Sequence, residues 1–153
     1  MEKICCFTGH RNIPDNLSDE LFEKLYKTIS QLASEGFCIF RAGGAVGFDR
    51  LAADAVLALR QKNPSIKLHI YVPCLDQNKY FSPEENDYYM AQIKSADKIM
   101  CISKTYTKGC MLQRNRAMVD GADACICYLR KAQGGTAYTV KYAEQKNCRV
   151  IHL

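Results

Sequence analysis

The stretch RAGGAVGFDRLAADAVLALR, residues 41–60, carries three glycines and an acid where a strand-like segment meets a helix-like one. Beyond this turn, apolar residues repeat with helical spacing, at Leu51, Ala52, Ala55, Val56 and Leu59. Glycines at a strand-to-helix turn either permit tight packing or let a ligand approach the backbone. The stretch therefore predicts a strand–turn–helix unit, and the sequence leaves both roles of its glycines open.

Apolar segments recur along the whole chain, with helical patterns between them. They are nearly continuous in apolar character, which is typical of strands buried on both faces of a sheet. Strands that alternate with helices form a parallel sheet with helices on both faces. We therefore predict a single Rossmann-like α/β domain over residues 1–153, with a mainly parallel sheet of about six strands. The expected strands are Ile4–Phe7, Phe37–Phe40, Leu68–Val72, Ile99–Ile102, Ala124–Tyr128 and Val150–Leu153.

Capping residues mark the expected helix ends. The first helix is predicted to begin with Ser18 as its N-cap, with Leu17 packed on Phe22, and to close at Gly36. The run Ser82-Pro83-Glu84-Glu85 is a capping box with proline at the first helical position, and it predicts the start of another helix. Two further helices are expected at 109–121 and 136–146.

The composition is that of an ordinary globular protein, with 48% hydrophobic and 24% charged residues. No apolar run is long enough to span a membrane, and a strand-like segment begins at once, so we expect neither a membrane span nor a signal peptide. Nine cysteines lie mostly inside apolar runs, without a Cys-x-x-Cys pair, and the histidines are far apart. This favours reduced thiols in a cytoplasmic protein, with no metal and no cofactor. The net charge of +5 fits an anionic ligand, a nucleic acid or a solvated surface, and decides nothing.

Ligands of such folds bind at the carboxyl ends of the strands. Thr8-Gly9-His10-Arg11 follows the first expected strand, and Gly134-Gly135-Thr136 follows the fifth. Glycine amides at a helix N-terminus favour an anion, a bidentate arginine would clamp it, and threonine hydroxyls would donate to it. These turns indicate an anion site, although glycines at such turns also serve plain helix–sheet packing.

Other side chains near these turns each have two interpretations. Asp49 would hold ribose hydroxyls or a base amine or act as a general base, or it only caps its helix. His10 would contact a ligand or is a polar surface group. Arg114 and Asn115 can share the ligand edge of one helix, or belong to a solvated basic face. The sequence does not separate these alternatives.

Taken together in this order and spacing, Thr8–Arg11, Gly43–Asp49, Arg114-Asn115-Arg116 and Gly134–Thr136 resemble the SLOG superfamily, and most closely its YpsA-like branch of bacterial proteins. More distant relatives are the Lonely Guy phosphoribohydrolases and the DNA-processing protein A family, whose motif the Arg-Asn-Arg run resembles. The resemblance covers essentially the whole chain. It implies a Rossmann-like fold that binds nucleotides or nucleotide-derived molecules.

Site residues carried over from the resemblance are Gly47 and Asp49, which match a Gly-x-Asp/Glu pair, and the second glycine-rich turn, which ends at Thr136. The sequence departs from the phosphoribohydrolases in one respect. Their Gly-Thr is followed on the next helix turn by an acid that assists cleavage of the N-glycosidic bond, whereas here no acid follows until Glu144. Asp49 as a substitute catalytic acid or base is therefore a hypothesis.

The leading hypothesis is binding of a nucleotide-derived small molecule, as a sensor or signalling component. The alternative is an N-glycoside hydrolase acting on nucleoside monophosphates, and single-stranded nucleic-acid binding ranks third because the basic residues are scattered. The resemblance also makes a homodimer an expected form, which the periodicity does not establish. The loop from Cys74 to Phe81 is expected either to stack Tyr80 and Phe81 on a base or to pack them on the third helix. The predicted ligand residues are Thr8, Gly9, His10, Arg11, Gly43, Gly44, Gly47, Asp49, Arg114, Asn115, Gly134, Gly135 and Thr136.

Overall fold

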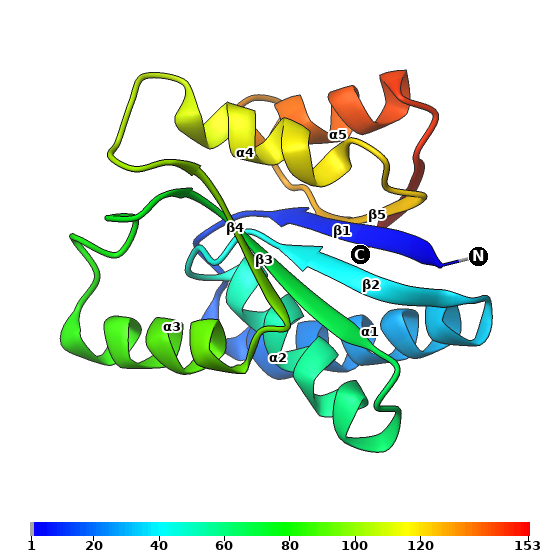
Figure 1. Ribbon diagram of the computed structural model, residues 1–153. Coiled ribbons are helices and arrows are strands. Elements are labelled where there is room, and N and C mark those ends of the chain that lie inside the picture. The colour runs from blue at the N-terminus through cyan, green and yellow to red at the C-terminus, as the bar shows by residue number, and fades with distance from the viewer. Residues whose placement is uncertain (1) are drawn as a thin grey trace.

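A computed structural model describes residues 2–153, and in them six strands alternate with five helices (Figure 1). The alternation agrees with the sequence pattern, with element ends shifted by a few residues. The elements are β1 (Lys3–Gly9), α1 (Asp15–Ser34), β2 (Phe37–Ala42), α2 (Phe48–Lys62), β3 (Lys67–Cys74), α3 (Pro83–Ser95), β4 (Lys98–Ser103), α4 (Cys110–Val119), β5 (Ala124–Tyr128), α5 (Gly135–Gln145) and β6 (Arg149–His152).

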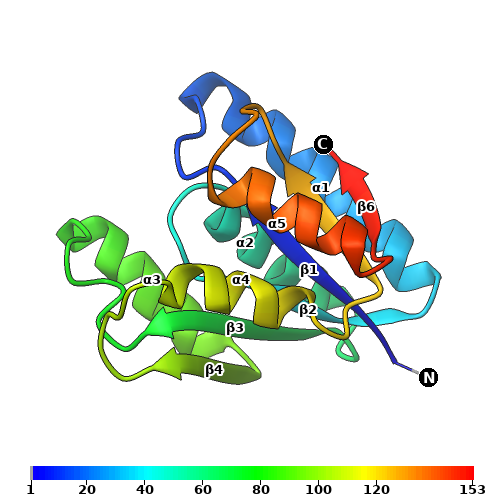
Figure 2. The same ribbon diagram turned by 90° about the horizontal axis from the view of Figure 1, so that it is seen from above.

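The strands form one sheet in the order β4-β3-β2-β1-β5-β6, and all neighbouring pairs are parallel. Helices α1, α2 and α3 cover one face of this sheet, and α4 and α5 cover the other (Figures 1 and 2). This confirms the predicted Rossmann-like fold. The chain order reverses between β1 and β5, so the crevice beyond the carboxyl ends of these strands is where a ligand site is expected.

The core is anchored by aromatic rings where α2 meets the centre of the sheet. Phe48, the first residue of α2, is fully buried, stacks on Tyr128 with ring centroids 6.1 Å apart, and meets Phe7 edge-on at 6.4 Å. A Cβ atom at Gly9 would overlap the Phe48 ring. The absence of a side chain at Gly9, the last residue of β1, therefore lets α2 pack closely against the sheet.

The first helix begins one turn earlier than predicted. It starts at Asp15 after Pro14, so Ser18 is not its N-cap, and the predicted staple between Leu17 and Phe22 is wrong. Pro14 has a φ of −56° and its carbonyl accepts a hydrogen bond from Leu17 N at 2.9 Å, which starts the helix without a side-chain cap. Gly36, with a φ of +99°, follows the helix end as expected.

The third helix begins as the sequence predicts. Glu85 N donates to Ser82 Oγ at 3.1 Å, and Ser82 N donates to Glu85 Oε1 at 2.9 Å, which completes the reciprocal capping box. Pro83 occupies the first helical position. The position of α3 matters for function because the loop in front of it borders a cavity.

The expectation that all strands are buried on both faces is wrong for β4 and β6. Both lie at the sheet edges, and Ile99 of β4 remains 41% exposed. Cys101, predicted to act as a small core residue, is also exposed, whereas Cys5, Cys6, Cys125 and Cys127 are fully buried. An edge strand has one partner only, so its apolar composition does not guarantee burial. Among residues 2–153, no helix is long and apolar enough to cross a membrane.

Replacing the Phe48 ring should test how far the fold depends on it. Phe48→Ala is expected to lower the free energy of unfolding by about 3–5 kcal/mol, because it leaves a cavity under β1 and β5. Tyr80→Ala serves as the control, since that ring is 89% exposed, and should change stability by less than about 0.5 kcal/mol. Urea unfolding followed by circular dichroism measures both, and equal effects would contradict the assignment.

Candidate functional site

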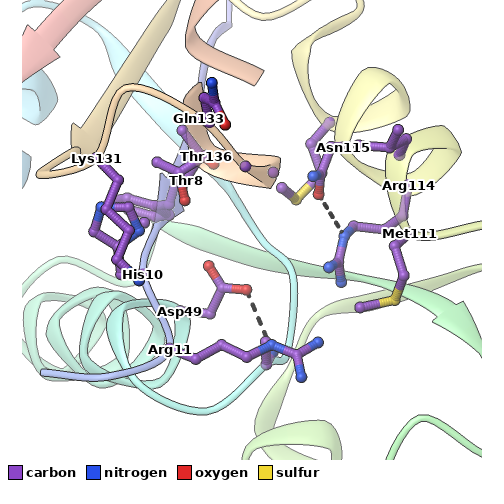
Figure 3. Close-up of a pocket in the computed structure, with 17 residues that line it drawn as sticks. Thr8, His10, Arg11, Asp49, Met111, Arg114, Asn115, Lys131, Gln133 and Thr136 are labelled. Carbon is purple, nitrogen blue, oxygen red and sulfur yellow. Dashed lines mark hydrogen bonds between the residues drawn. The ribbon is translucent and has the colours of Figure 1, made fainter. Parts of the chain in front are cut away.

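A cavity of about 350 Å³ lies at the carboxyl edge of the sheet, between the end of β1, α4 and the start of α5 (Figure 3). Its lining brings together predicted residues from four separate parts of the chain. These are Thr8, Gly9, His10, Arg11, Asp49, Arg114, Asn115, Gly134, Gly135 and Thr136. Phe7, Ala45, Met111, Leu112, Met118, Lys131 and Gln133 also line it, and sequence reasoning had not placed them in the site.

The start of α5 forms an open wall of this cavity. Gly134 has a φ of +109°, and a Cβ there would meet nothing within 4 Å. A Cβ at Gly135 would have only Asn115 Nδ2 nearby, at 4.0 Å. The first hydrogen bond of the helix runs from Tyr138 N to the Gly134 carbonyl at 3.0 Å, so the preceding amides have no partner within the helix. These glycines leave free N–H groups at the positive end of a helix dipole.

Arg114 is 4% exposed, and its guanidinium is held by carbonyls of the turn after β2 and of β3. Its Nη1 donates to the carbonyls of Gly43 at 2.5 Å and Tyr71 at 3.2 Å, and to Gln77 Oε1 at 3.4 Å. Nη2 has no hydrogen-bond partner among residues 2–153. Arg114 is therefore mainly a structural tie, with one amino group left for a ligand.

Asn115 is oriented by the same guanidinium. Arg114 Nε donates to Asn115 Oδ1 at 2.8 Å, so the amide oxygen of Asn115 faces the guanidinium and its amide nitrogen points away from that group. That nitrogen would lie 4.0 Å from a Cβ placed at Gly135, and Figure 3 shows Arg114 and Asn115 on the side of the cavity opposite Thr8 and Thr136. The internal bond thus presents two N–H donors towards the start of α5.

Asp49 is 8% exposed and is the one carboxylate that lines the cavity among residues 2–153. Its Oδ2 accepts a hydrogen bond from Ala45 N at 3.3 Å, which closes the loop before α2 rather than capping the helix itself. Burial raises the pKa of Asp49, and the nearby Arg114 charge, the Ala45 amide and Arg11 oppose that rise. This bond fastens the turn in front of the helix, so the prediction that Asp49 only caps the helix is wrong, while a ligand or catalytic role for it stays a prediction.

Thr8 and Thr136 add two hydroxyl groups to the cavity wall, and both residues are largely buried. Among residues 2–153, Arg41 Nε is the only fully buried side-chain nitrogen or oxygen without a hydrogen-bond partner. The hydroxyl of the next threonine, Thr139, donates to the Gly135 carbonyl at 2.8 Å. Within the described part of the chain, the hydroxyls of Thr8 and Thr136 have no such partner, and both residues line the cavity.

His10 joins the two loops that frame the cavity. Arg130 N donates to His10 Nε2 at 2.8 Å, so the neutral ring carries its proton on Nδ1. Burial lowers the pKa of His10, and the charges of Lys131 and Arg130 lower it further. The ring also meets Tyr128 edge-on, with centroids 6.0 Å apart. His10 therefore positions the loop before α5.

Arg11 and Lys131 are the exposed cations at the rim. Arg11 takes part in none of the ion pairs found in residues 2–153, and Figure 3 shows its side chain reaching across the cavity below Asp49. Lys131 and Gln133 lie in the loop before Gly134. The sequence signal that could have placed these two residues in the site was their position, because their loop follows the end of β5 and leads into Gly134.

The glycines of the opening stretch do not line this cavity. A Cβ at Gly47, whose φ is +83°, would overlap the backbone carbonyl of Arg11. A Cβ at Gly43 would lie 2.6 Å from Asp49 Oδ2 and 2.9 Å from Arg114 Nη1, and Gly44 is enclosed by Ile70 and Tyr89 at 3.2 Å. Packing therefore explains these glycines, whereas those before α5 face open space.

The fold and the cavity together define a Rossmann-like α/β protein with a polar pocket at the carboxyl edge of its sheet. Residues 6–151 match the YspA SLOG family, and the chain belongs to this family. The resemblance noted in the sequence is thereby confirmed.

Relatives and solved structures extend this assignment. The uncharacterized SPbeta prophage-derived protein YoqJ of Bacillus subtilis is 27% identical over 139 residues, which cover 82% of this chain and 81% of YoqJ. DNA processing protein A from Helicobacter pylori, described with its single-stranded DNA binding mode, is similar with a TM-score of 0.68 at 19% identity, over 98% of this chain and 64% of that one. The Streptococcus pneumoniae protein gives 0.70 at 16% identity, over 98% and 50%. At these identities the likeness shows the fold alone, and this chain spans only part of each DNA processing protein.

Glycines that are enclosed by packing and glycines that face open space should respond differently to substitution. Gly47→Ala is expected to lower the free energy of unfolding by more than about 2 kcal/mol, because it combines backbone strain with overlap. Gly135→Ala, at an open helical position without a positive φ, should be neutral or stabilising by up to about 1 kcal/mol. Urea denaturation of both variants checks this, and a large loss for Gly135→Ala would contradict it.

Asp49→Asn should show a pH-dependent gain in stability. The pKa of Asp49 is raised in the fold, so its contribution to stability is complete below the unfolded value and declines as pH rises through the folded value. Asparagine keeps an acceptor for Ala45 N and stays neutral. The variant should therefore gain on the wild type as pH increases above about 4. Unfolding free energies at a series of pH values test this, and a pH-independent difference would refute it.

Proposed function

We propose that this protein binds a nucleotide or nucleotide-derived small molecule, with a phosphate at the start of α5, and acts as a sensor or signalling component. The observation that carries the proposal is the donor-rich lining of the cavity. Free amides of α5, the Thr8 and Thr136 hydroxyls and the Asn115 amide converge on one space. Such a set of donors matches the oxygen atoms of a phosphate group.

The charges around the cavity support the same ligand class. Arg11, Arg114 and Lys131 outnumber the single carboxylate of Asp49. In Figure 3, Asp49 lies between the threonines Thr8 and Thr136 on one side and the Arg114–Asn115 pair on the other. Its Oδ1 accepts no hydrogen bond among residues 2–153. An acceptor beside a phosphate site is suited to ribose hydroxyls, which a bare inorganic anion lacks. The lining therefore favours a phosphorylated sugar over phosphate alone.

Asp49 also supports the second candidate function, hydrolysis of an N-glycosidic bond. Glu144 of α5, the next acid after Thr136, does not line the cavity, so Asp49 would have to act alone. Burial raises the pKa of Asp49, which suits a general acid. Release of free base from a nucleoside monophosphate, abolished in Asp49→Asn, would establish this reaction.

Single-stranded DNA is a third ligand to test, since a structural neighbour, DNA processing protein A of H. pylori, is described with its mode of binding it. Backbone contacts to several phosphates make such binding fall steeply with salt. Binding of a single phosphate engages fewer charges and is therefore less sensitive to salt. Titrations at two salt concentrations therefore separate these ligands.

Isothermal titration calorimetry with ribose 5-phosphate and nucleoside 5′-monophosphates tests the proposal directly. The wild type should bind, and Arg11→Ala should weaken binding about tenfold or more by removing a charged donor. Arg149→Ala is the matched control, because Arg149 pairs with Glu35 away from the cavity.

Stability controls exclude a trivial result. Arg11 is exposed and forms no ion pair among residues 2–153, so Arg11→Ala should change the unfolding free energy by less than about 0.5 kcal/mol. Equal affinities of Arg11→Ala and the wild type, or no binding of any phosphorylated sugar, would reject the proposed site.

A further inference from the structure

A second cavity, of about 430 Å³, lies beside the first. It is formed by the β3–α3 loop and the β4–α4 loop, and it shares Arg11 and Met111 with the first cavity. Each volume falls near the lower end of the range for ligand pockets, about 300–1,000 Å³. Two adjoining cavities with a shared wall can therefore hold two parts of one ligand.

The two loops are joined to each other. Leu75 N of the β3–α3 loop donates to the Lys104 carbonyl of the β4–α4 loop at 3.3 Å. Within the β4–α4 loop, Ser103 Oγ donates to the Thr105 carbonyl at 2.7 Å. Figures 1 and 2 show both loops at the same end of the sheet, beyond the carboxyl ends of β3 and β4. The second cavity thus opens on the same edge as the first.

Two tyrosines line this cavity, and the rings of both are largely exposed. Tyr80 is 89% exposed and Tyr106 is 66% exposed. Phe81, the neighbour of Tyr80, is instead packed against Tyr89, with centroids 5.5 Å apart and planes at 89°. The two predictions for this loop therefore apply to different residues, since Phe81 packs at the start of α3 and Tyr80 remains available.

Polar groups of the second cavity connect it to the first. Gln77 lines it and accepts from Arg114 Nη1 at 3.4 Å, while its Nε2 donates to Tyr89 Oη at 3.5 Å. Asp76 adds an exposed carboxylate, which can only accept hydrogen bonds and therefore matches the N–H groups on the edge of a base. Lys79 also lines the cavity, with its Nζ 5.5 Å from the centre of the Tyr80 ring, and Arg11 is shared with the first cavity. The cavity thus joins aromatic faces with an acceptor, and Lys79 is its one cation among residues 2–153 that the first cavity does not share.

We infer that the second cavity receives the base of the ligand, stacked against Tyr80 and Tyr106, while the sugar phosphate occupies the first cavity. This inference rests on the proposed function. Arg11 then spans the junction and contacts the ligand between its two parts. The ligand class is consequently a nucleotide with an intact base rather than a sugar phosphate alone, because every base offers a face for stacking.

Calorimetry with ribose 5-phosphate, AMP, GMP, CMP and UMP separates the two parts of the site. Wild-type protein should bind at least one nucleotide more tightly than ribose 5-phosphate. The double variant Tyr80→Ala/Tyr106→Ala should lose about tenfold in affinity for that nucleotide, and its affinity for ribose 5-phosphate should not change. Tyr138→Ala is the control, because this half-exposed tyrosine of α5 binds Arg116 and lines neither cavity.

Fluorescence provides an independent readout, because the chain contains no tryptophan. Tyr80→Trp places a single indole in the second cavity, and stacking of a base should quench its emission, whereas ribose 5-phosphate should not. Tyr138→Trp should respond to neither. Both variants replace exposed rings, so neither should impair folding.

The outcomes distinguish the two proposals. If ribose 5-phosphate and nucleotides bind equally well to the wild type and the double variant, the base lies elsewhere and the present inference is wrong while the phosphate site stands. If none of these ligands binds to wild-type protein, the proposed function itself is wrong. Loss of ribose 5-phosphate binding in the double variant would also overturn the inference, since the tyrosines would then act on the first cavity.

Discussion

The carboxyl edge of the sheet depends on the burial of one guanidinium group, that of Arg114. A buried cation is costly unless its donors are satisfied, and here the carbonyls of Gly43, just after β2, and of Tyr71 in β3 accept from it. This requirement fixes the position of α4 and leaves no room for a side chain at Gly43. The charge of Arg114 also lies near Asp49 and opposes the rise in the pKa of that carboxyl group. The first cavity is what remains between these fixed groups and the start of α5.

Much of this architecture is readable from the sequence, because the strands β1, β3 and β5 are continuous apolar runs and the capping box before α3 is a local device. Local signals failed where tertiary context decided. Ser18 has the right chemistry for a cap, but Pro14 starts the helix earlier. Ile99 has the composition of a core residue, and only the strand order reveals that it lies at an edge.

The site was predicted as a set of strand-end residues, and most of these line one cavity. The sequence does not predict which glycines are enclosed by packing and which face open space, because both turns contain a Gly-Gly pair before a helix. What differs is the surroundings: Asp49 and Arg114 crowd Gly43, whereas nothing approaches Gly134. Likewise, the sequence alone does not distinguish an exposed arginine from a buried one that ties backbone segments together, and only the fold separates Arg11 from Arg114 in this way.

The asymmetric construction of the two cavities has a consequence for the evolution of this fold. The first cavity includes buried polar groups, such as Asp49 and Arg114, whose replacement would disturb the core. The second is bounded by loop residues such as Asp76, Tyr80 and Tyr106, which contribute little to packing. Substitutions there are close to neutral for folding. Changes in two short loops can therefore alter the lining of the second cavity without loss of the scaffold's stability.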